Sequence, residues 1–155
     1  MIIECDTRQQ KDIDITNYFD EQGIKWIRNK LYCGDYKRTD SITTIIDTKK
    51  DLLELSGNLC SKREHQRIKK ELQRAGEIGC RKFVFLIADE YITDVGMVSK
   101  WQVPLNILGK PFTEVKPETL QLIMETMILR YGVEFMFVKK ENIGQAIVQL
   151  LEGQI

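Results

Sequence analysis

The sequence has only one histidine and four cysteines among its 155 residues. Cys5, Cys33, Cys60 and Cys80 include no C-x-x-C pair, and His65 has no second histidine to act with it. Structural zinc sites and disulfide frameworks both need clustered ligands of these types. We therefore expect no zinc site, and we expect the cysteines to be free, small apolar residues of the interior.

Long apolar runs and nucleotide-binding loops are also absent. The longest apolar run, FVFLIA at 83–88, is far shorter than the roughly 20 residues that cross a bilayer. The opening MIIECD lacks the basic start and apolar middle of a secretory signal. There is no glycine-rich loop of the Walker or dinucleotide kind, which disfavours a small-molecule-binding α/β domain. We expect a cytoplasmic, intracellular protein with no membrane partner.

Composition and charge are those of an ordinary globular domain. With 43% apolar and 30% charged residues, the chain is predicted to form one domain over residues 1–155. The net charge is zero, yet residues 61–82 hold eight basic and three acidic side chains. A basic helix of this kind can be a surface that contacts phosphates, although a solvated helix face is the more common cause of this pattern. The sequence leaves both interpretations open.

The periodicity of the chain predicts alternating strands and helices. Strands are expected at 1–6, 24–32, 42–49, 81–90 and 133–138, with a turn-rich segment at 33–41. Helices are expected at 12–23, capped by Asp14 or Thr16, then at 51–59, 61–76, 117–131 and 141–153, with an interruption at 56–58. The first strands should form a meander and the later ones should alternate with helices. The predicted fold class is α/β, a mixed sheet flanked by helices.

One strand carries an acid and a lysine that can act together. Side chains alternate along 42–49, so Asp47 and Lys49 share a face, roughly 7 Å apart at Cα. Asp35 lies in the preceding turn, and a hairpin between 24–32 and 42–49 would bring the two acids together. Two carboxylates bind a hard divalent cation, and a neighbouring ammonium orients the attacking water. Alone, the tripeptide Asp-Thr-Lys is a weak pattern, and a surface ion pair is the favoured interpretation of it.

Three motifs occur in this order along the chain: ECDTRQ at 4–9, GDY at 34–36 and IIDTKKDL at 45–52. A basic helix containing KREHQR and the strand FVFLIADE follow them. In these motifs the chain resembles the nuclease domain of the XPF-like structure-specific endonucleases, a branch of the PD-(D/E)xK superfamily. The resemblance extends from residue 1 to about residue 90 in motif, and to 155 in element order. It implies a restriction-endonuclease-like fold, with a central mixed β-sheet flanked by α-helices.

The resemblance also implies a function and a set of site residues. It implies a Mg²⁺- or Mn²⁺-dependent endonuclease acting on branched or flap DNA in recombination, repair or replication, with a homodimer as one arrangement. Asp35 and Asp47 would bind the metal with the carbonyl of Thr48, Asp6 would assist, and Lys49 would position the water. The residues expected to contact DNA are Arg8, Arg63, Gln66, Arg67 and Lys70.

The chain departs from the family pattern at several positions. Asp47 and Thr48 stand where the family has glutamate and arginine, and Gln9 replaces the glutamate of the first motif. Aspartate retains a metal ligand on a shorter arm. The pair Asp51-Leu52 lies two residues closer to the third motif than in the family. Tandem helix-hairpin-helix motifs, which follow this domain in eukaryotic and archaeal relatives, are absent, so we expect a stand-alone domain of the phage or mobile-element type.

Other interpretations remain. An inactive nuclease-fold module for DNA binding or assembly is the alternative function, although the intact set of two acids and a lysine argues against it. Asp6 could simply form a turn at the end of its strand. Tyr36 and Trp101 could stack on bases, but packing is the favoured prediction for both. His65 has no acid-base partner in the pattern.

Overall fold

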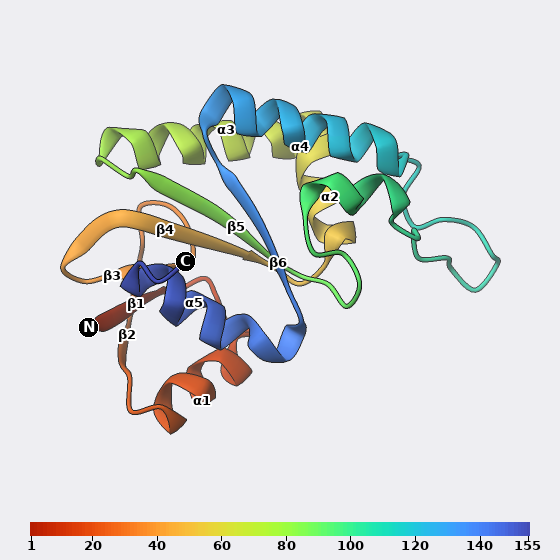
Figure 1. Ribbon diagram of the computed structural model, residues 1–155. Helices are drawn as coiled ribbons and strands as arrows, with labels where there is room; N and C mark the ends of the chain where they lie inside the picture. Colours follow the sequence, from red (N-terminus) through yellow and green to blue (C-terminus); the bar gives the residue numbers. More distant parts are fainter.

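A six-stranded sheet forms the middle layer of the protein in the computed structural model, which describes residues 1–155 (Figure 1). The strands are β1 (Ile2–Asp6), β2 (Lys25–Asn29), β3 (Tyr36–Arg38), β4 (Ser41–Lys49), β5 (Lys82–Ala88) and β6 (Glu134–Val138). The α-helices are α1 (Ile13–Glu21), α2 (Leu52–Cys60), α3 (Lys62–Glu77), α4 (Pro117–Tyr131) and α5 (Ile143–Glu152), and two short 3-10 helices are η1 (Val95–Lys100) and η2 (Lys140–Asn142). The predicted fold class is confirmed.

The sheet has the order β2-β1-β3-β4-β5-β6 and mixes both strand directions. Strand β3 is antiparallel to β1 and to β4, whereas β1 with β2, β4 with β5, and β5 with β6 are parallel pairs. The predicted meander and the predicted hairpin between 24–32 and 42–49 are therefore wrong. Helix α1 is a crossover that makes β2 parallel to β1 at the sheet edge. The segment 33–41, predicted to be turn-rich, contains the three-residue strand β3. This strand pairs with β4, where the strand at 24–32 was predicted to pair.

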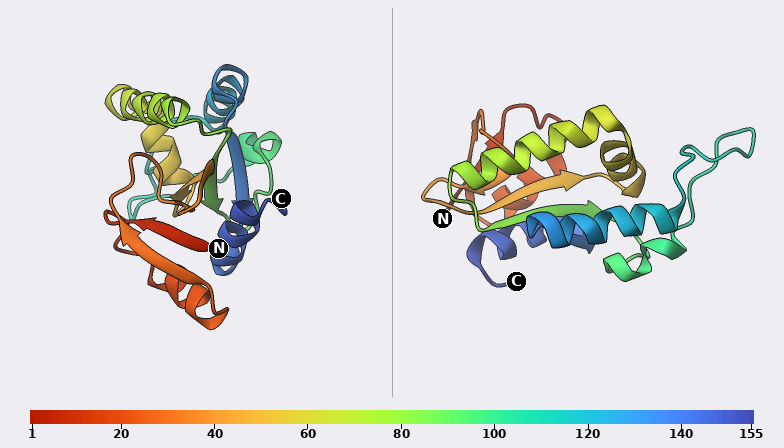
Figure 2. Two further views of the ribbon diagram at one scale, coloured as in Figure 1. Left: turned by 90° about the vertical axis from the view of Figure 1, so that its left-hand side faces the viewer. Right: turned by 90° about the horizontal axis from the view of Figure 1, so that it is seen from above.

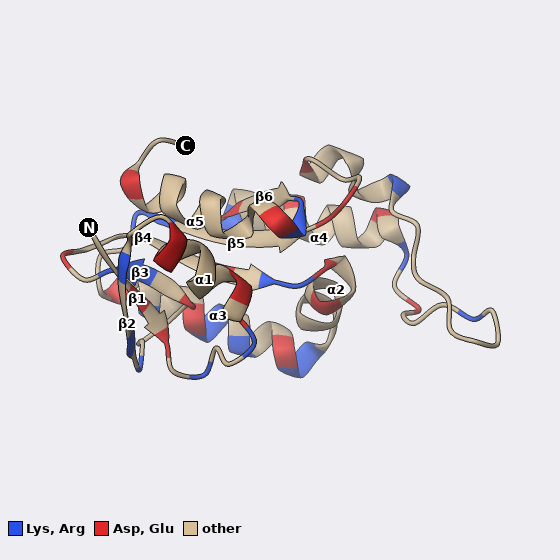
Figure 3. Cartoon of the chain, turned by 90° about the horizontal axis from the view of Figure 1, so that it is seen from below, with Lys and Arg blue, Asp and Glu red and all other residues tan.

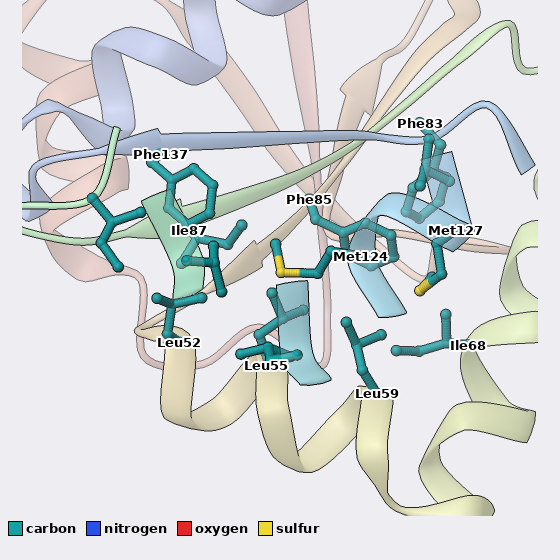
Figure 4. Close-up of a cluster of buried hydrophobic side chains, with 14 of the residues drawn as sticks. Leu52, Leu55, Leu59, Ile68, Phe83, Phe85, Ile87, Met124, Met127 and Phe137 are labelled. Carbon is teal, nitrogen blue, oxygen red and sulfur yellow. The ribbon is translucent and has the colours of Figure 1, made fainter. Parts of the chain in front are cut away.

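Helices cover both faces of the sheet, and each face has its own apolar core (Figure 2). Phe83, Phe85 and Ile87 of β5 point to the face covered by α2, α3 and α4, where they meet leucines of α2 (Figure 4). The intervening Val84 and Leu86 point to the face covered by α1 and α5. An unbroken apolar strand is buried on both faces, as the sequence of β5 predicts.

Local signals placed most helix ends correctly. Helix α4 has the predicted bounds, and Gly132 ends it in the left-handed conformation with φ of 64°. Helix α2, by contrast, continues through residues 56–58 and ends at Cys60, because one glycine does not break a helix whose leucines are buried. The predicted caps of α1 are wrong, since Asp12 is at the N-cap and its carboxylate binds Arg28 and Tyr36 instead. All four cysteines are free, and none of the helices has the length and hydropathy of a membrane span.

Candidate active site

Asp47 and Lys49 form an ion pair near the end of β4. The Nζ of Lys49 lies 2.9 Å from Oδ1 of Asp47, and the side chains are 11% and 8% exposed. The alternation of the strand predicts this shared face, and the pairing confirms it. Burial lowers the pKa of the Lys49 ammonium, but its attraction to Asp47 outweighs this and the net pKa is raised. Lys49 is therefore a cation at neutral pH.

Asp35 reaches the same end of β4 from the turn that precedes β3. The backbone N–H of Asp35 donates to the carbonyl of Ile46 at 2.8 Å. The carboxylate Oδ2 of Asp35 then accepts from both the backbone N–H and the hydroxyl of Thr48, each at 2.8 Å. The carboxylate of Asp35 thus accepts the backbone N–H of Thr48 in the way that a carbonyl of a neighbouring strand would. These hydrogen bonds hold the carboxylate beside Asp47.

Both acids have raised pKa values. Burial raises the pKa of Asp35, and the neighbouring Asp47 adds to the effect by like-charge repulsion. Burial also raises the pKa of Asp47, which Lys49 only partly offsets, while Glu71 raises it further. Two close, poorly solvated carboxylates are the arrangement that a divalent cation relieves.

Each acid keeps one oxygen free of protein hydrogen bonds. Oδ2 of Asp35 is engaged and Oδ1 of Asp47 is paired with Lys49, which leaves Oδ1 of Asp35 and Oδ2 of Asp47. The only buried side-chain polar atom without a partner in the protein is the hydroxyl of Ser56, so both free oxygens reach solvent. This pair of hard oxygen donors fits Mg²⁺ or Mn²⁺ with water completing the shell.

Asp6 lies next to this pair but is already engaged. Its carboxylate accepts from Nε of Arg8 at 2.6 Å through one oxygen and from the backbone N–H of Leu31 at 2.9 Å through the other. The structure contains no group of three His, Cys, Asp or Glu side chains that could hold a metal. Asp6 therefore does not join Asp35 and Asp47 as a direct ligand in this geometry, and the turn-forming interpretation is favoured. Arg8 itself is mostly exposed and retains free N–H groups.

The predicted DNA-contact residues of α3 lie on its exposed side. Arg63, Gln66, Arg67 and Lys70 are all exposed, and only Arg67 has a salt bridge, with Glu64 at 2.8 Å. Acidic residues are interspersed among the more numerous Lys and Arg residues of this helix (Figure 3). The basic surface of α3 is therefore exposed. This exposure is expected both for a surface that contacts phosphates and for a solvated helix face.

Two residues of the site were not identified from the sequence. The amide of Gln9 donates to Oδ2 of Asp35 at 3.1 Å and to the hydroxyl of Thr48 at 2.8 Å. Glu71 of α3 accepts from the backbone N–H of Gly34 at 2.7 Å and so fixes the turn that carries Asp35. Glu71 lies three residues after Ile68 on the buried stripe of α3, and a carboxylate on such a stripe is the signal that could have found it.

The remaining candidates serve other purposes. Tyr36 is fully buried and donates its hydroxyl to Asp12, and Trp101 packs against the core, so packing is the better interpretation of both. The Nδ1 of His65 contacts the carbonyl of Leu59 at 2.9 Å, away from the acids. A surface hollow of about 370 Å³ lies between the ends of α3 and α4 and is lined by none of the predicted site residues.

Comparison with known proteins identifies the family of the domain and supports its fold. The family model of the ERCC4 domain matches residues 5–150. Among solved structures, XPF from Aeropyrum pernix superposes with a TM-score of 0.69 at 15% identity, over 99% of this chain and 65% of that one. XPF from Aeropyrum pernix in complex with DNA gives 0.68 at 16% identity, over 99% and 64%. This chain thus spans less than two thirds of either solved chain. No curated protein sequence matches it.

Proposed function

This chain belongs to the ERCC4 domain family, and from that membership we propose that it is a Mg²⁺- or Mn²⁺-dependent endonuclease domain that hydrolyses phosphodiester bonds in DNA. The observation that carries the proposal is the pair of half-buried Asp35 and buried Asp47, each with one oxygen open to solvent, beside the mostly buried ammonium of Lys49. An ion pair alone does not need a second carboxylate beside it.

A bound divalent cation would offset the charge that develops on the phosphate and would lower the pKa of a bound water. Asp35 and Asp47 would hold that cation through their free oxygens, with the carbonyl of Thr48 as a further proposed ligand. Asp35 is kept in place by Gln9 and Thr48, so little reorganisation is needed.

Lys49 would act on the attacking water. One N–H of its ammonium is used by Asp47, and the other two can donate to the water and to a non-bridging phosphate oxygen. The water oxygen forms a new bond to phosphorus and gives up one proton to solvent, while the bond to the leaving sugar oxygen breaks and that oxygen takes up a proton. Arg8 would pair with an adjacent phosphate through its exposed N–H groups.

We propose branched or flap DNA as the substrate, with the exposed residues of α3 as the contact surface. Arg63, Arg67 and Lys70 would neutralise phosphates, and Gln66 would donate to them. The related XPF from Aeropyrum pernix was solved with DNA, which supports a nucleic-acid partner for this fold. A DNA substrate also agrees with the intracellular location expected from the sequence.

A second copy of the chain is the proposed protein partner. The outer side of α4 exposes Leu122 and Leu129, seven residues apart on one stripe. Unpaired aliphatic side chains on one stripe favour association. Sedimentation of the wild type and of Leu122→Glu tests this, with a shift from dimer to monomer as the expected result.

Cleavage of labelled fork, flap, junction and linear duplex DNA, with Mg²⁺, Mn²⁺ or EDTA, tests the proposed activity. We expect Asp47→Asn and Lys49→Met to lose cleavage, while Asp40→Asn, at an exposed aspartate paired with Arg38, should retain it. Cleavage that ignores chelation or survives Asp47→Asn would refute the mechanism. Binding of every substrate without cleavage would favour the inactive DNA-binding module instead.

A further inference from the structure

A closed hairpin projects from the body between η1 and α4. Leu105 and Pro111 form an antiparallel bridge, and the N–H of Asn106 donates to the carbonyl of Lys110 at 2.7 Å. The side-chain oxygen of Asn106 accepts from two further N–H groups of the turn, and Gly109 adopts the positive φ of 75° that the turn requires. We call residues 105–112 the hairpin. Its hydrogen bonds make it an ordered element.

The tip of the hairpin presents apolar side chains to water. Ile107 is fully exposed and Leu108 is 77% exposed, while Leu105 and Phe112 are each 60% exposed. Scattered exposed leucines are normal on a surface, but four large apolar side chains on one short turn form a patch. The hydrogen bonds hold this patch away from the core, which indicates a surface that contacts a partner.

The base of the hairpin is fixed to the body. Trp101 before it and Val115 after it both pack against the core below α2, α3 and α4. The N–H of Ser99 donates to the side chain of Gln121 on α4 at 2.8 Å. The position of the hairpin tip relative to the sheet is therefore fixed by these contacts.

That place is at the same end of the sheet as the candidate active site. Strands β4 and β5 are parallel, and Lys49 is paired in register with Ile87, one residue before β5 ends. The chain leaves β5 at this end, and the hairpin extends outward beyond the end of β4 (Figures 1 and 2). A DNA molecule lying at Asp35 and Asp47 would have the hairpin on its flank.

The charges around the tip favour a polyanion. Residues 100–116 contain Lys100, Lys110 and Lys116 with Glu114 as the only acid, and the segment is otherwise uncharged (Figure 3). Lysines beside an apolar tip match the end of a duplex, where stacked bases expose an apolar face and phosphates surround it. Apolar side chains that insert between base steps are an established way to bend or open a duplex.

We propose that the hairpin is a wedge that packs on the last base pair of a duplex arm where its strands part. This deepens the proposed function, on which it rests, by naming the single-strand/double-strand junction as the feature recognised. Ile107 and Leu108 cover the exposed base pair, and Lys110 pairs with a neighbouring phosphate. The wedge sets the distance from the junction to the acids.

The test uses forked and linear DNA with 2-aminopurine at the junction, in EDTA so that metal-dependent cleavage does not interfere. The double variant Ile107→Ser, Leu108→Ser changes only exposed side chains, and Ile13→Ser on α1, at 68% exposure, is the matched control. We expect the double variant to bind forks roughly tenfold more weakly, to bind linear duplex as before, and to lose the fluorescence rise of an unstacked base. Ile107→Phe should keep the fluorescence rise.

Unchanged fork binding and fluorescence in the double variant would overturn the wedge. Loss of binding to vesicles of anionic and neutral phospholipids, with forks unaffected, would assign the tip to a lipid surface. A change in sedimentation alone would assign it to a second copy. The proposed function and the wedge can fail separately. If the protein binds and unstacks forks but shows no Mg²⁺-dependent cleavage, the nuclease is refuted and the wedge is retained. If it cleaves DNA without preferring forks, the nuclease is retained and the wedge is refuted.

Discussion

The amide of Gln9 donates a 3.1 Å hydrogen bond to the same carboxylate oxygen of Asp35 that accepts from Thr48. Because that oxygen is saturated, the other oxygen of Asp35 is directed to solvent and is available to a cation. A glutamine can donate to a carboxylate, whereas the glutamate of related sequences cannot unless it is protonated. With glutamate at this position the site would have a further carboxylate. With Gln9 it instead has an amide that holds the carboxylate of Asp35 in place.

We predict that Gln9→Ala weakens Mn²⁺ binding about fivefold, which corresponds to roughly 1 kcal/mol, the net contribution typical of one hydrogen bond. Titration calorimetry measures the affinity directly. Gln10→Ala, at the exposed neighbour of Gln9, is the control. Equal affinities in wild type and Gln9→Ala would show that the hydrogen bond does not position Asp35.

The raised pKa values of Asp35 and Asp47 predict the pH dependence of stability without metal. A carboxyl group whose pKa is raised by folding binds protons more tightly when folded, so its contribution is present at low pH and is lost as pH rises above its ordinary value of 3.8. We expect the melting temperature to fall by about 3 °C or more between about pH 5 and about pH 8.

Mg²⁺ or Mn²⁺ should reverse this loss, because the cation binds the ionised pair. The metal-induced gain in melting temperature should grow with pH and should be absent in Asp47→Asn, as measured by calorimetry with and without EDTA. A gain that is the same at both ends of the pH range would contradict the assignment of the metal to these acids.

Gly34 is needed at the turn that carries Asp35. Its φ is 71°, and an added Cβ would overlap Cγ2 of Ile45 and lie 3.2 Å from the carbonyl of Ile46. We expect Gly34→Ala to lower the free energy of unfolding by about 2 kcal/mol or more, from strain and overpacking together. Gly23→Ala, with a φ of 66° and open space around it, should cost only about 1 kcal/mol. Chemical denaturation measures both, and equal losses would refute the packing argument.

Lys49→Met separates catalysis from metal binding. The methionine fills a similar volume without the ammonium, so we expect cleavage to fall by roughly 10² to 10⁴ while Mn²⁺ still binds. Single-turnover cleavage and calorimetry provide the two measurements. Cleavage within about twofold of wild type would show that Lys49 serves only as the partner of Asp47.

The basic side of α3 makes a prediction about salt. Lys70→Gln should weaken binding to all DNA structures alike and should reduce the slope of log affinity against log salt by about one. Lys140→Gln, an exposed lysine of η2, is the control. An unchanged slope in Lys70→Gln would favour the solvated-face interpretation of the charge run.

The sequence by itself determined most of the elements and one half of the site. Periodicity and end signals gave five of the six strands and all five α-helices, because these patterns are local. The same alternation placed Asp47 and Lys49 on one face, since both belong to one strand.

Only the tertiary structure decided which distant segments meet at that strand. It inserted β3 between β1 and β4, joined Asp6 to the backbone of Leu31, and brought Gln9 and Glu71 to the turn of Asp35. A three-residue strand has too little periodicity to be recognised, and contacts between segments 25 to 39 residues apart leave no local pattern in the chain. The second half of the site therefore depends on how the sheet is assembled.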